Sequence, residues 1–153
     1  MDKTIGYHYS DADVPDGHVF ESLSDSIDRI HAANRPAELA IRAAREDGAK
    51  RGAVVFAWRD RAWADFAYKY SKKKFLYDVV IDEADIVHIA DLTHYNSVRD
   101  NLAKGESADE AIEAYWTNAP TPERERPRIE ILTQKFKVVS RIAPARLVPP
   151  TKP

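Results

Sequence analysis

The sequence predicts a domain of the α/β or α+β class. Segments rich in β-branched and aromatic residues alternate with segments whose apolar residues recur at helical spacing. Turn-forming residues separate many of these segments. With 153 residues, the chain suits one domain that buries about two thirds of its unfolded surface. We therefore expect a single domain over residues 1–143 and a frayed, proline-rich tail over residues 144–153.

The first elements expected are a strand, a loop and a helix. Thr4–Tyr9 has the composition of a short strand, and Asp11–Gly17 is dense in turn residues. Ser22 is a good N-cap residue, and the residues that follow it have apolar side chains at helical spacing up to His31. Pro36 is expected to interrupt this helix.

A second helix, a strand and a third helix are expected next. Ala37–Asp47 has alanine and leucine on one side, and Gly48 suits the end of a helix. Ala53–Trp58 is a continuous apolar run, which is typical of a strand buried on both faces. Asp60 is expected to cap a helix with a broad apolar face that packs on the sheet. That face contains Ala62, Trp63, Phe66, Ala67 and Tyr70.

Two strands and another helix follow. Phe75–Asp82 and Ile86–Ala90 are predicted strands joined by a tight acidic turn. The helix expected over Thr93–Ala103 is ended by Gly105, because glycine readily adopts the left-handed conformation that follows many helices.

The last predicted elements are a helix, a loop and a hairpin. A capping box of Ser107 with Glu110 is expected to begin the helix. Asn118–Pro127 combines prolines with alternating charges and is expected to be a surface loop. Arg128–Thr133 and Phe136–Ile142 are expected to form a hairpin that turns at residues 134 and 135.

The composition excludes several kinds of site. The 23 basic and 25 acidic side chains give a net charge of -2, which argues against a general polyanion binder. Because the chain has no cysteine, disulfides, thiol nucleophiles and thiolate metal sites are excluded. The five glycines are too scattered for a GxGxxG turn or a Walker loop.

Common metal, hydrolase and targeting motifs are also absent. No two of the five histidines have the i, i+4 spacing of a helical zinc site, so no metal is expected. There is no GxSxG motif, although a serine triad assembled from distant segments stays open. We expect a cytoplasmic protein without a membrane partner, because no signal peptide or long apolar run occurs.

Four segments combine a histidine, aromatic residues and a carboxylate. They are residues 6–10 (GYHYS), 55–58 (VFAW), 64–68 (ADFAY) and 128–132 (RIEIL). In order and spacing these segments resemble the ADP-ribosyltransferase superfamily, specifically the branch with a histidine, tyrosine and glutamate signature to which diphtheria toxin belongs. The first segment also resembles the opening of rifampin ADP-ribosyltransferases. The order of elements matches from about Thr4 to Ile142.

The resemblance implies a fold, an activity and a catalytic residue. The fold would be α+β, with a split β-sheet, mixed or antiparallel, and flanking helices. The enzyme would cleave the nicotinamide–ribose bond of NAD, its substrate, and transfer ADP-ribose to an acceptor without a metal. Glu130 occupies the position of the family's glutamate, where a carboxylate stabilises positive charge on the ribose in the transition state. The alternative is that Glu130 is a solvated carboxylate on an edge strand.

The resemblance also implies four NAD-binding residues. His8 would hydrogen-bond the adenosine-side ribose, since neutral imidazole both donates and accepts, and Tyr9 would bind NAD beside it. Tyr68 and Phe56 would stack on the nicotinamide ring, although the family more often has tyrosine at the position of Phe56. Alternatively, His8 and Tyr68 are packing residues.

The acceptor and the biological setting stay open at this level. Arg128 stands where the arginine-modifying branch has a second Glu or Gln, so arginine is a less favoured acceptor. A protein, a nucleic acid, a small molecule or water remain, and with water the enzyme would be an NAD glycohydrolase. A catalytically inactive binding module is a further alternative. The sequence does not distinguish a toxin or phage effector from a metabolic enzyme, and it does not indicate an oligomeric state.

Overall fold

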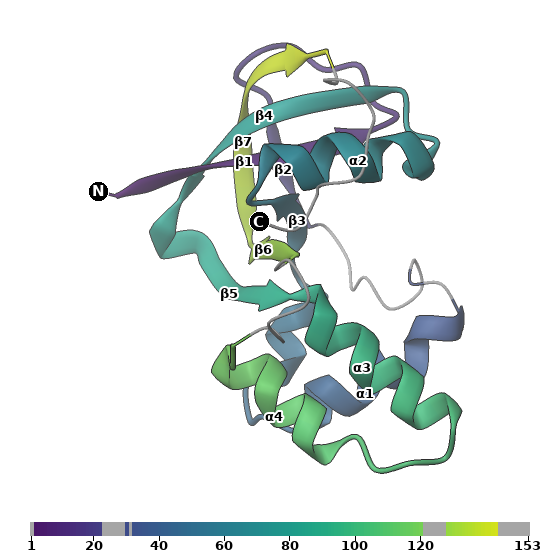
Figure 1. Cartoon of the computed structure of the whole chain (residues 1–153). Coiled ribbons are helices and arrows are strands. Elements are labelled where there is room, and N and C mark those ends of the chain that lie inside the picture. Colours follow the sequence, from purple (N-terminus) through teal and green to yellow (C-terminus); the bar gives the residue numbers. More distant parts are fainter. Residues whose placement is uncertain (1, 23–29, 31, 121–127, 144–153) are drawn as a thin grey trace.

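The computed structural model describes residues 2–22, 30, 32–120 and 128–143 of the chain (Figure 1). The expected helix after Ser22, most of the loop before Arg128 and the proline-rich tail therefore lie largely outside the described residues. Within the described part, no helix combines the length and the apolar character needed to cross a bilayer.

The described strands form one seven-stranded sheet in which each strand pairing is antiparallel. The strand order is β2-β7-β4-β1-β3-β6-β5. The α+β class is confirmed. A mixed or an antiparallel sheet was expected, and the sheet is antiparallel. The strands are β1 (Lys3–Ser10), β2 (Val19–Glu21), β3 (Val55–Trp58), β4 (Phe75–Asp82), β5 (Ile86–Asp91), β6 (Ile129–Thr133) and β7 (Lys135–Ile142).

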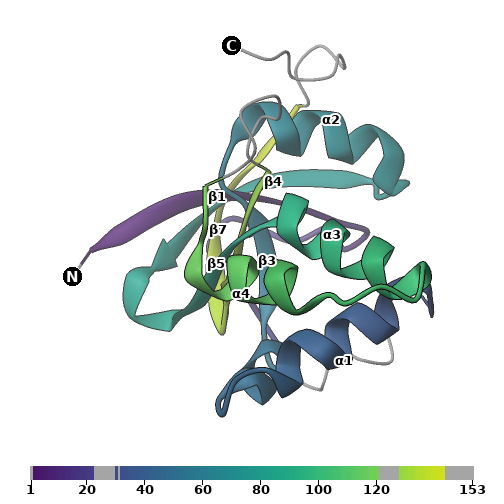
Figure 2. The ribbon, with the colours of Figure 1, turned by 60° about the horizontal axis from the view of Figure 1, so that its bottom comes forward.

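The helices occupy two places around this sheet (Figures 1 and 2). The helices α1 (Arg35–Ala43), α3 (Leu92–Ala103) and α4 (Asp109–Thr117) lie together and pack on one hydrophobic core with Val54 and Leu132. The helix α2 (Arg61–Ser71) lies apart from them, against β1 and β3. A second core, which includes Tyr77 and Ile131, lies on the other face of the sheet.

The two neighbours of β1 in the sheet hold it to very different extents. β1 pairs with β4 along its whole length, from Lys3↔Asp82 to Ser10↔Phe75. Between the fully described strands β1 and β3, the register has a single pair, Tyr7↔Trp58. The two strands therefore separate beyond Tyr7, and the sheet opens along this line.

Gly6 lets the two strands approach each other just before they separate. A Cβ atom at this position would lie 3.0 Å from the Ala57 Cβ and 3.1 Å from the Ile81 Cδ1. Such distances are too short for an ordinary carbon–carbon contact, so a side chain here would push β1 away from β3.

The predicted hairpin of the last two strands is wrong. β6 pairs with β3 and β5, whereas β7 pairs with β2 and β4 at the other side of the sheet. Gln134, between them, donates its backbone N–H to the Asp85 carbonyl at 3.0 Å, which holds this corner of the chain. β4 and β5 are likewise consecutive but not adjacent, and the short 3₁₀ helix Glu83–Asp85 connects them. Tertiary pairing therefore overrode the local turn signals.

The first described α-helix differs from its prediction at both ends. Pro36 lies in the first turn of α1, where its missing N–H has no partner to lose, and the helix that it was expected to interrupt lies largely outside the described residues. The helix ends at Ala43 instead of Asp47, and a 3₁₀ helix over Gly48–Gly52 follows. Gly48 packs so closely on the end of α1 that a Cβ atom there would overlap the Arg42 carbonyl group.

The other helices agree with the sequence in position but not in every contact. Asp60 occupies the N-cap position of α2 without a side-chain cap hydrogen bond. α2 buries Ala64 completely, whereas Tyr70 is 64% exposed, so the expected aromatic stripe does not pack wholly on the sheet. Gly105 follows α3 with a φ of 72°, as predicted. The N-cap of α4 is Ala108, so the predicted capping box is wrong.

Two features of the strands were also not anticipated. β2 is a short edge strand in the segment that follows the predicted loop, and Val19 in it is 44% exposed. Within β3, Ala57 alone is fully buried, so the prediction of burial on both faces is wrong. β3 is only partly covered because it borders an open cavity.

Candidate active site

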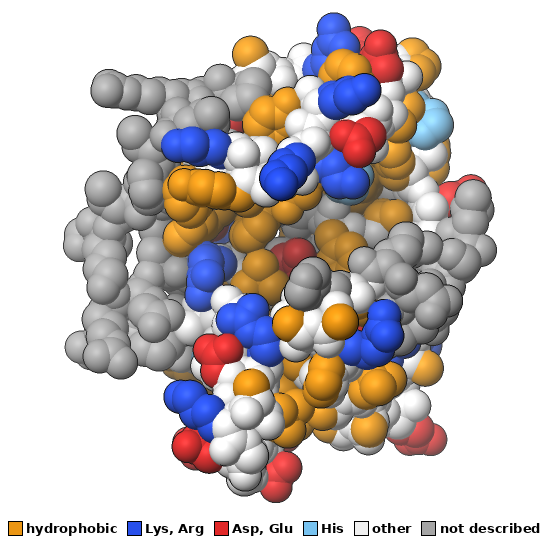
Figure 3. Space-filling model, turned by 90° about the vertical axis from the view of Figure 1, so that its right-hand side faces the viewer, with side chains coloured by type: hydrophobic (Ala, Val, Ile, Leu, Met, Phe, Trp, Pro, Cys, Tyr) orange, Lys and Arg blue, Asp and Glu red, His pale blue; other side chains and the backbone are white. Residues whose placement is uncertain are grey.

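A cavity of about 510 Å³ lies where β1 and β3 separate. Residues 7–10 of β1 form one wall, and residues 54–58 in and before β3 form the other. Ile30, Lys73 and Glu130 complete the lining. Figure 3 shows a hollow on this side of the molecule, with hydrophobic side chains and a recessed acidic side chain inside it. The volume is in the range, about 300–1,000 Å³, of small-molecule sites.

Four of the five residues proposed for NAD chemistry meet in this cavity. His8 and Tyr9 come from β1, Phe56 comes from β3, and Glu130 comes from β6. These strands are distant in sequence, and the register of the sheet brings them together.

The register also decides on which face each side chain lies. Tyr7, Trp58 and Glu130 are in register across three strands and therefore share a face of the sheet. Tyr9 lies two residues after Tyr7, so it shares this face, and His8 lies on the opposite one. Both His8 and Tyr9 line the cavity because this part of β1 has no described strand paired with it on the β3 side, so side chains from both of its faces reach the opening.

Glu130 is a partly buried carboxyl group in the cavity wall. Burial raises its pKa from the usual 4.5 to about 7, the positive charge of Arg51 lowers the pKa, and the negative charge of Glu38 raises it. Near pH 7, Glu130 is therefore divided between its neutral and ionised forms. A carboxylate shielded from water in this way interacts strongly with a positive charge that develops beside it.

His8 is neutral at physiological pH and has a fixed orientation. Its Nδ1 lies 2.8 Å from the Phe56 carbonyl oxygen, which only accepts, so Nδ1–H is the donor. Burial lowers the His8 pKa to about 4, while the hydrogen bond to Phe56 raises it and the charge of Lys73 lowers it. The rings of Phe20 and Phe136 pack against the imidazole at centroid distances of 5.0 and 4.9 Å. In this tautomer, Nε2 is an acceptor.

Aromatic side chains form much of the cavity wall near Glu130. Phe56 and Trp58 are on the same face of β3, and Tyr9 faces them from β1. Burial raises the Tyr9 pKa, the Trp58 side chain lowers it through a hydrogen bond, and Glu130 raises it. Tyr9 is therefore a neutral phenol close to both Trp58 and Glu130. Trp58 was not among the predicted site residues, although the two-residue period of the VFAW strand places it on the same face as Phe56.

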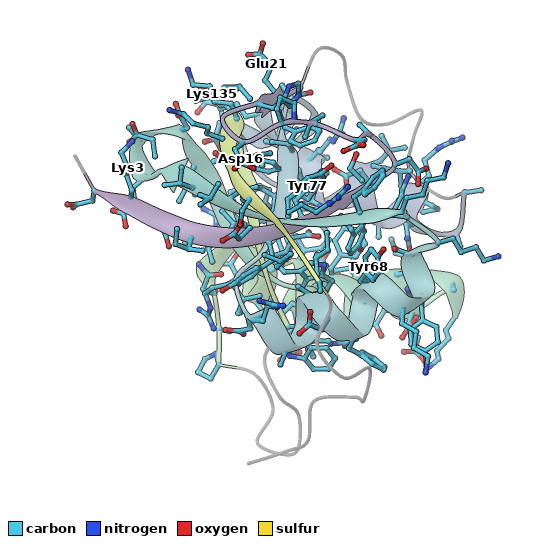
Figure 4. The ribbon with its side chains drawn as sticks, turned by 90° about the horizontal axis from the view of Figure 1, so that it is seen from above. Lys3, Asp16, Glu21, Tyr68, Tyr77 and Lys135 are labelled. Carbon is cyan, nitrogen blue, oxygen red and sulfur yellow. The ribbon has the colours of Figure 1, made fainter. Side chains whose placement is uncertain are left out.

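Tyr68 lies away from the cavity. Its hydroxyl donates to the Lys74 carbonyl oxygen at 2.6 Å, and its side chain borders a separate hollow with Phe75 and Arg141. In Figure 4, Tyr68 is on α2, on the opposite side of the β1–β4 ribbons from Glu21. The structure thus does not bring Tyr68 together with the other predicted site residues.

A buried polar cluster close to Glu130 was not expected from the sequence. Arg51 and Glu38 are 3% and 1% exposed, and the Arg51 Nε lies 2.8 Å from the Glu38 Oε2. Arg51 also donates to the Tyr115 hydroxyl, and its guanidinium lies 5.1 Å from the Tyr95 ring centroid. Charged residues of this kind are usually exposed, so no local pattern indicates their burial.

The start of β6 is anchored to α3, which positions Glu130. The Arg128 N–H donates to the Asp91 Oδ1 at 3.3 Å, and the Leu92 N–H donates to the Arg128 carbonyl at 2.9 Å. Asp91 also accepts from the Thr93 N–H at the N-terminus of α3. Both the N–H and the carbonyl group of Arg128 are therefore hydrogen-bonded, and Glu130 lies two residues after this fixed position.

The raised pKa of Glu130 and the lowered pKa of His8 predict opposite pH dependences of stability. Native Glu130 binds a proton that the unfolded chain releases between pH 4.5 and about 7, so its contribution is lost as the pH rises through that range. Native His8 lacks a proton that the unfolded chain binds between about pH 4 and 6.5, so stability is lost as the pH falls. The two contributions partly cancel in the intact protein.

Single substitutions should expose each contribution. In Glu130→Gln, only the His8 contribution remains. The free energy of unfolding should then rise by about 2 kcal/mol as the pH rises from about 4 to 6.5, a value reduced to allow for the water in the cavity. In His8→Gln, it should fall by a similar amount as the pH rises through the Glu130 range. Urea unfolding at a series of pH values measures both. Parallel pH curves for the two variants would contradict the assigned pKa shifts.

No protein-family model and no curated protein matches this chain. Among the described residues, no three or more histidine, aspartate or glutamate side chains are grouped so that they could hold a metal ion.

Proposed function

We propose that this protein is an NAD-dependent mono-ADP-ribosyltransferase, an enzyme that cleaves the nicotinamide–ribose bond of NAD and transfers ADP-ribose to a macromolecule or a small molecule. The observation that carries the proposal is the meeting of His8, Tyr9, Phe56 and Glu130 in one cavity. The sequence resemblance assigns the same four residues to NAD chemistry, and they come from three strands that are distant in the sequence.

In this proposal Glu130 acts on the ribose. As the bond from the ribose carbon to the nicotinamide nitrogen breaks, its electron pair leaves with nicotinamide and positive charge develops on the ribose. The ionised carboxylate stabilises this charge and accepts a hydrogen bond from a ribose hydroxyl, which strengthens as the charge grows. An acceptor nucleophile then bonds to the same carbon and loses its proton.

The aromatic wall would hold the nicotinamide ring. Nicotinamide in NAD is flat and cationic, so it is attracted to the faces of aromatic rings by roughly 0.5–2 kcal/mol. Tyr9, Phe56 and Trp58 line the cavity together with Glu130. We therefore assign the stacking role to these residues in place of Tyr68, whose hydroxyl is bound to the Lys74 carbonyl.

His8 would bind the adenosine-side ribose. Its Nδ1–H is used by the Phe56 carbonyl, so the remaining nitrogen accepts a hydrogen bond from a hydroxyl group. Because its lowered pKa keeps the imidazole neutral, this acceptor stays available at physiological pH.

The decisive experiment is a nicotinamide-release assay. The purified chain is incubated with NAD, with and without cell lysate, and free nicotinamide is measured. We expect release that lysate stimulates, with label from adenine-labelled NAD appearing on an acceptor. Release without an acceptor would identify an NAD glycohydrolase. No release above background under either condition would refute the enzyme and favour a binding module.

A further inference from the structure

The cavity has opposite charges in its lining. Glu130 is its acidic residue, on β6, and Lys73 is a basic residue that reaches it from the turn after α2. Lys73 lines the cavity together with His8 and Ser10 of β1, the strand that pairs with β4 just beyond this turn. The positive charge of Lys73 is close enough to the His8 imidazole to lower its pKa. The basic end of the cavity is therefore the His8 end.

The turn that contains Lys73 has a defined conformation. Lys72 ends α2 in the left-handed region, with a φ of 59°, and the Lys73 N–H donates to the Ser71 Oγ at 3.1 Å. The Lys74 N–H donates to the Asp11 Oδ1 at 3.2 Å, which ties the turn to the end of β1. These two hydrogen bonds hold the Lys73 backbone beside the cavity.

The ion pair that Lys73 makes is one that a ligand can replace. Its Nζ lies 3.6 Å from the Asp11 Oδ2, and the two side chains are 44% and 57% exposed. An exposed pair of this kind contributes little to stability, so its loss on ligand binding costs little. Ser10 accepts a hydrogen bond from the Ala12 N–H at 3.1 Å, so its hydroxyl proton is still able to donate.

We propose that Lys73 and Ser10 form a phosphate-binding site at the mouth of the cavity, which takes the diphosphate of the dinucleotide. The assignment of this diphosphate rests on the proposed function. The ammonium group and the hydroxyl supply the donors that phosphate oxygens need. Glu130 and the aromatic wall repel the diphosphate and attract the cationic ring, so the two ends of the ligand are distinguished by charge.

Lys73 and Glu130 together fix the direction in which the dinucleotide binds. With the diphosphate at Lys73, the adenosine-side ribose lies near His8 and the nicotinamide-side ribose near Glu130. The reversed ligand would place the uncharged adenine, instead of the cationic nicotinamide, beside Glu130 and would lose the attraction to the carboxylate. Figure 3 shows Lys and Arg side chains around the rim of the hollow, which favour the approach of an anionic ligand.

The test compares Lys73→Gln with Lys72→Gln. Both variants lose one positive charge, but Lys72 is an exposed neighbour that does not line the cavity. The probes are ADP-ribose, which contains the diphosphate but no nicotinamide, and adenosine, which contains no phosphate. Affinities are measured by titration calorimetry.

We expect Lys73→Gln to weaken ADP-ribose binding by about tenfold, the usual size of a lost charge-assisted hydrogen bond. Lys72→Gln should change it by less than about twofold, in line with a screened surface charge. Adenosine binding should be equal in all forms. Asp11→Asn should strengthen ADP-ribose binding, because it removes the competing carboxylate.

The outcomes separate this site from the proposed activity. Equal losses in the two lysine variants, or no loss in either, would overturn the phosphate site even if the enzyme releases nicotinamide. Wild-type protein that does not bind ADP-ribose would overturn it as well. Selective loss in Lys73→Gln without nicotinamide release by the wild type would support the phosphate site and refute the transferase.

Discussion

Replacement of Glu130 by Gln should lower nicotinamide release from NAD by about 10²- to 10³-fold, the usual effect of removing one transition-state electrostatic partner. Gln has nearly the same shape as Glu but cannot become negative. The substitution therefore removes the charge that opposes the developing ribose cation while it leaves the cavity filled. The initial rate of nicotinamide release at saturating NAD is the measurement.

The pH dependence of the rate provides a second signature of Glu130. Because the ionised form is the active one and burial raises its pKa to about 7, the rate should increase as the pH rises through that value. Glu83→Gln is the matched control, since Glu83 is an exposed carboxylate in the connection between β4 and β5. A nearly full rate for Glu130→Gln would show that this residue is not catalytic.

Arg51→Met should destabilise the protein by about 3 kcal/mol, the lower end of the cost of breaking a buried ion pair, because it removes the more deeply buried of the two arginines that neutralise Glu38. Glu38 is 1% exposed and shares its Oε2 with Arg51 and Arg42, each at 2.8 Å. The Arg51 guanidinium also lies 5.1 and 5.2 Å from the ring centroids of Tyr95 and Tyr115, contacts that methionine would not replace with a charge. Urea unfolding monitored by tryptophan fluorescence measures the loss.

Arg42→Met is the matched control for this ion pair. Arg42 reaches the same oxygen at the same distance, but its side chain is 13% exposed against 4% for Arg51. We expect it to cost about 1 kcal/mol, as for ordinary helical i, i+4 pairs. If Arg42→Met and Arg51→Met lowered the free energy of unfolding equally, the deeper burial of Arg51 would not give it a larger contribution. Arg51→Lys keeps the charge and should be intermediate, which provides a folded form if Arg51→Met does not fold.

Arg51 also links the stability of the core to the candidate site. Its positive charge lowers the Glu130 pKa, and Glu38 raises it. Loss of Arg51 would therefore favour the neutral form of Glu130 and move the pH–rate curve to higher pH. In a folded Arg51→Lys variant, which keeps the positive charge, we expect the pH–rate curve to stay unchanged.

The strands that contain the candidate site residues were predictable because their signals are local. His8 and Glu130 lie on strands with clear β-composition, and the alternation in RIEIL placed Glu130 on the face opposite Ile129 and Ile131. Tyr68 was harder, because a helix periodicity does not specify which side faces a cavity, and its hydroxyl turns to the Lys74 carbonyl instead. Trp58 was missed although it is the direct cross-strand partner of Glu130.

By itself, the amino-acid sequence determined the α+β class, the positions of most strands and helices, and the strands that contain His8, Phe56 and Glu130. These follow from periodicity and from local backbone preferences, which act over a few residues. The tertiary structure alone decided that β6 and β7 are separated, that β1 and β3 part beyond Tyr7, and that Arg51 and Glu38 are buried near Glu130. Strand neighbours and burial depend on contacts between distant segments, so the cavity and the raised pKa of Glu130 exist only in the folded chain.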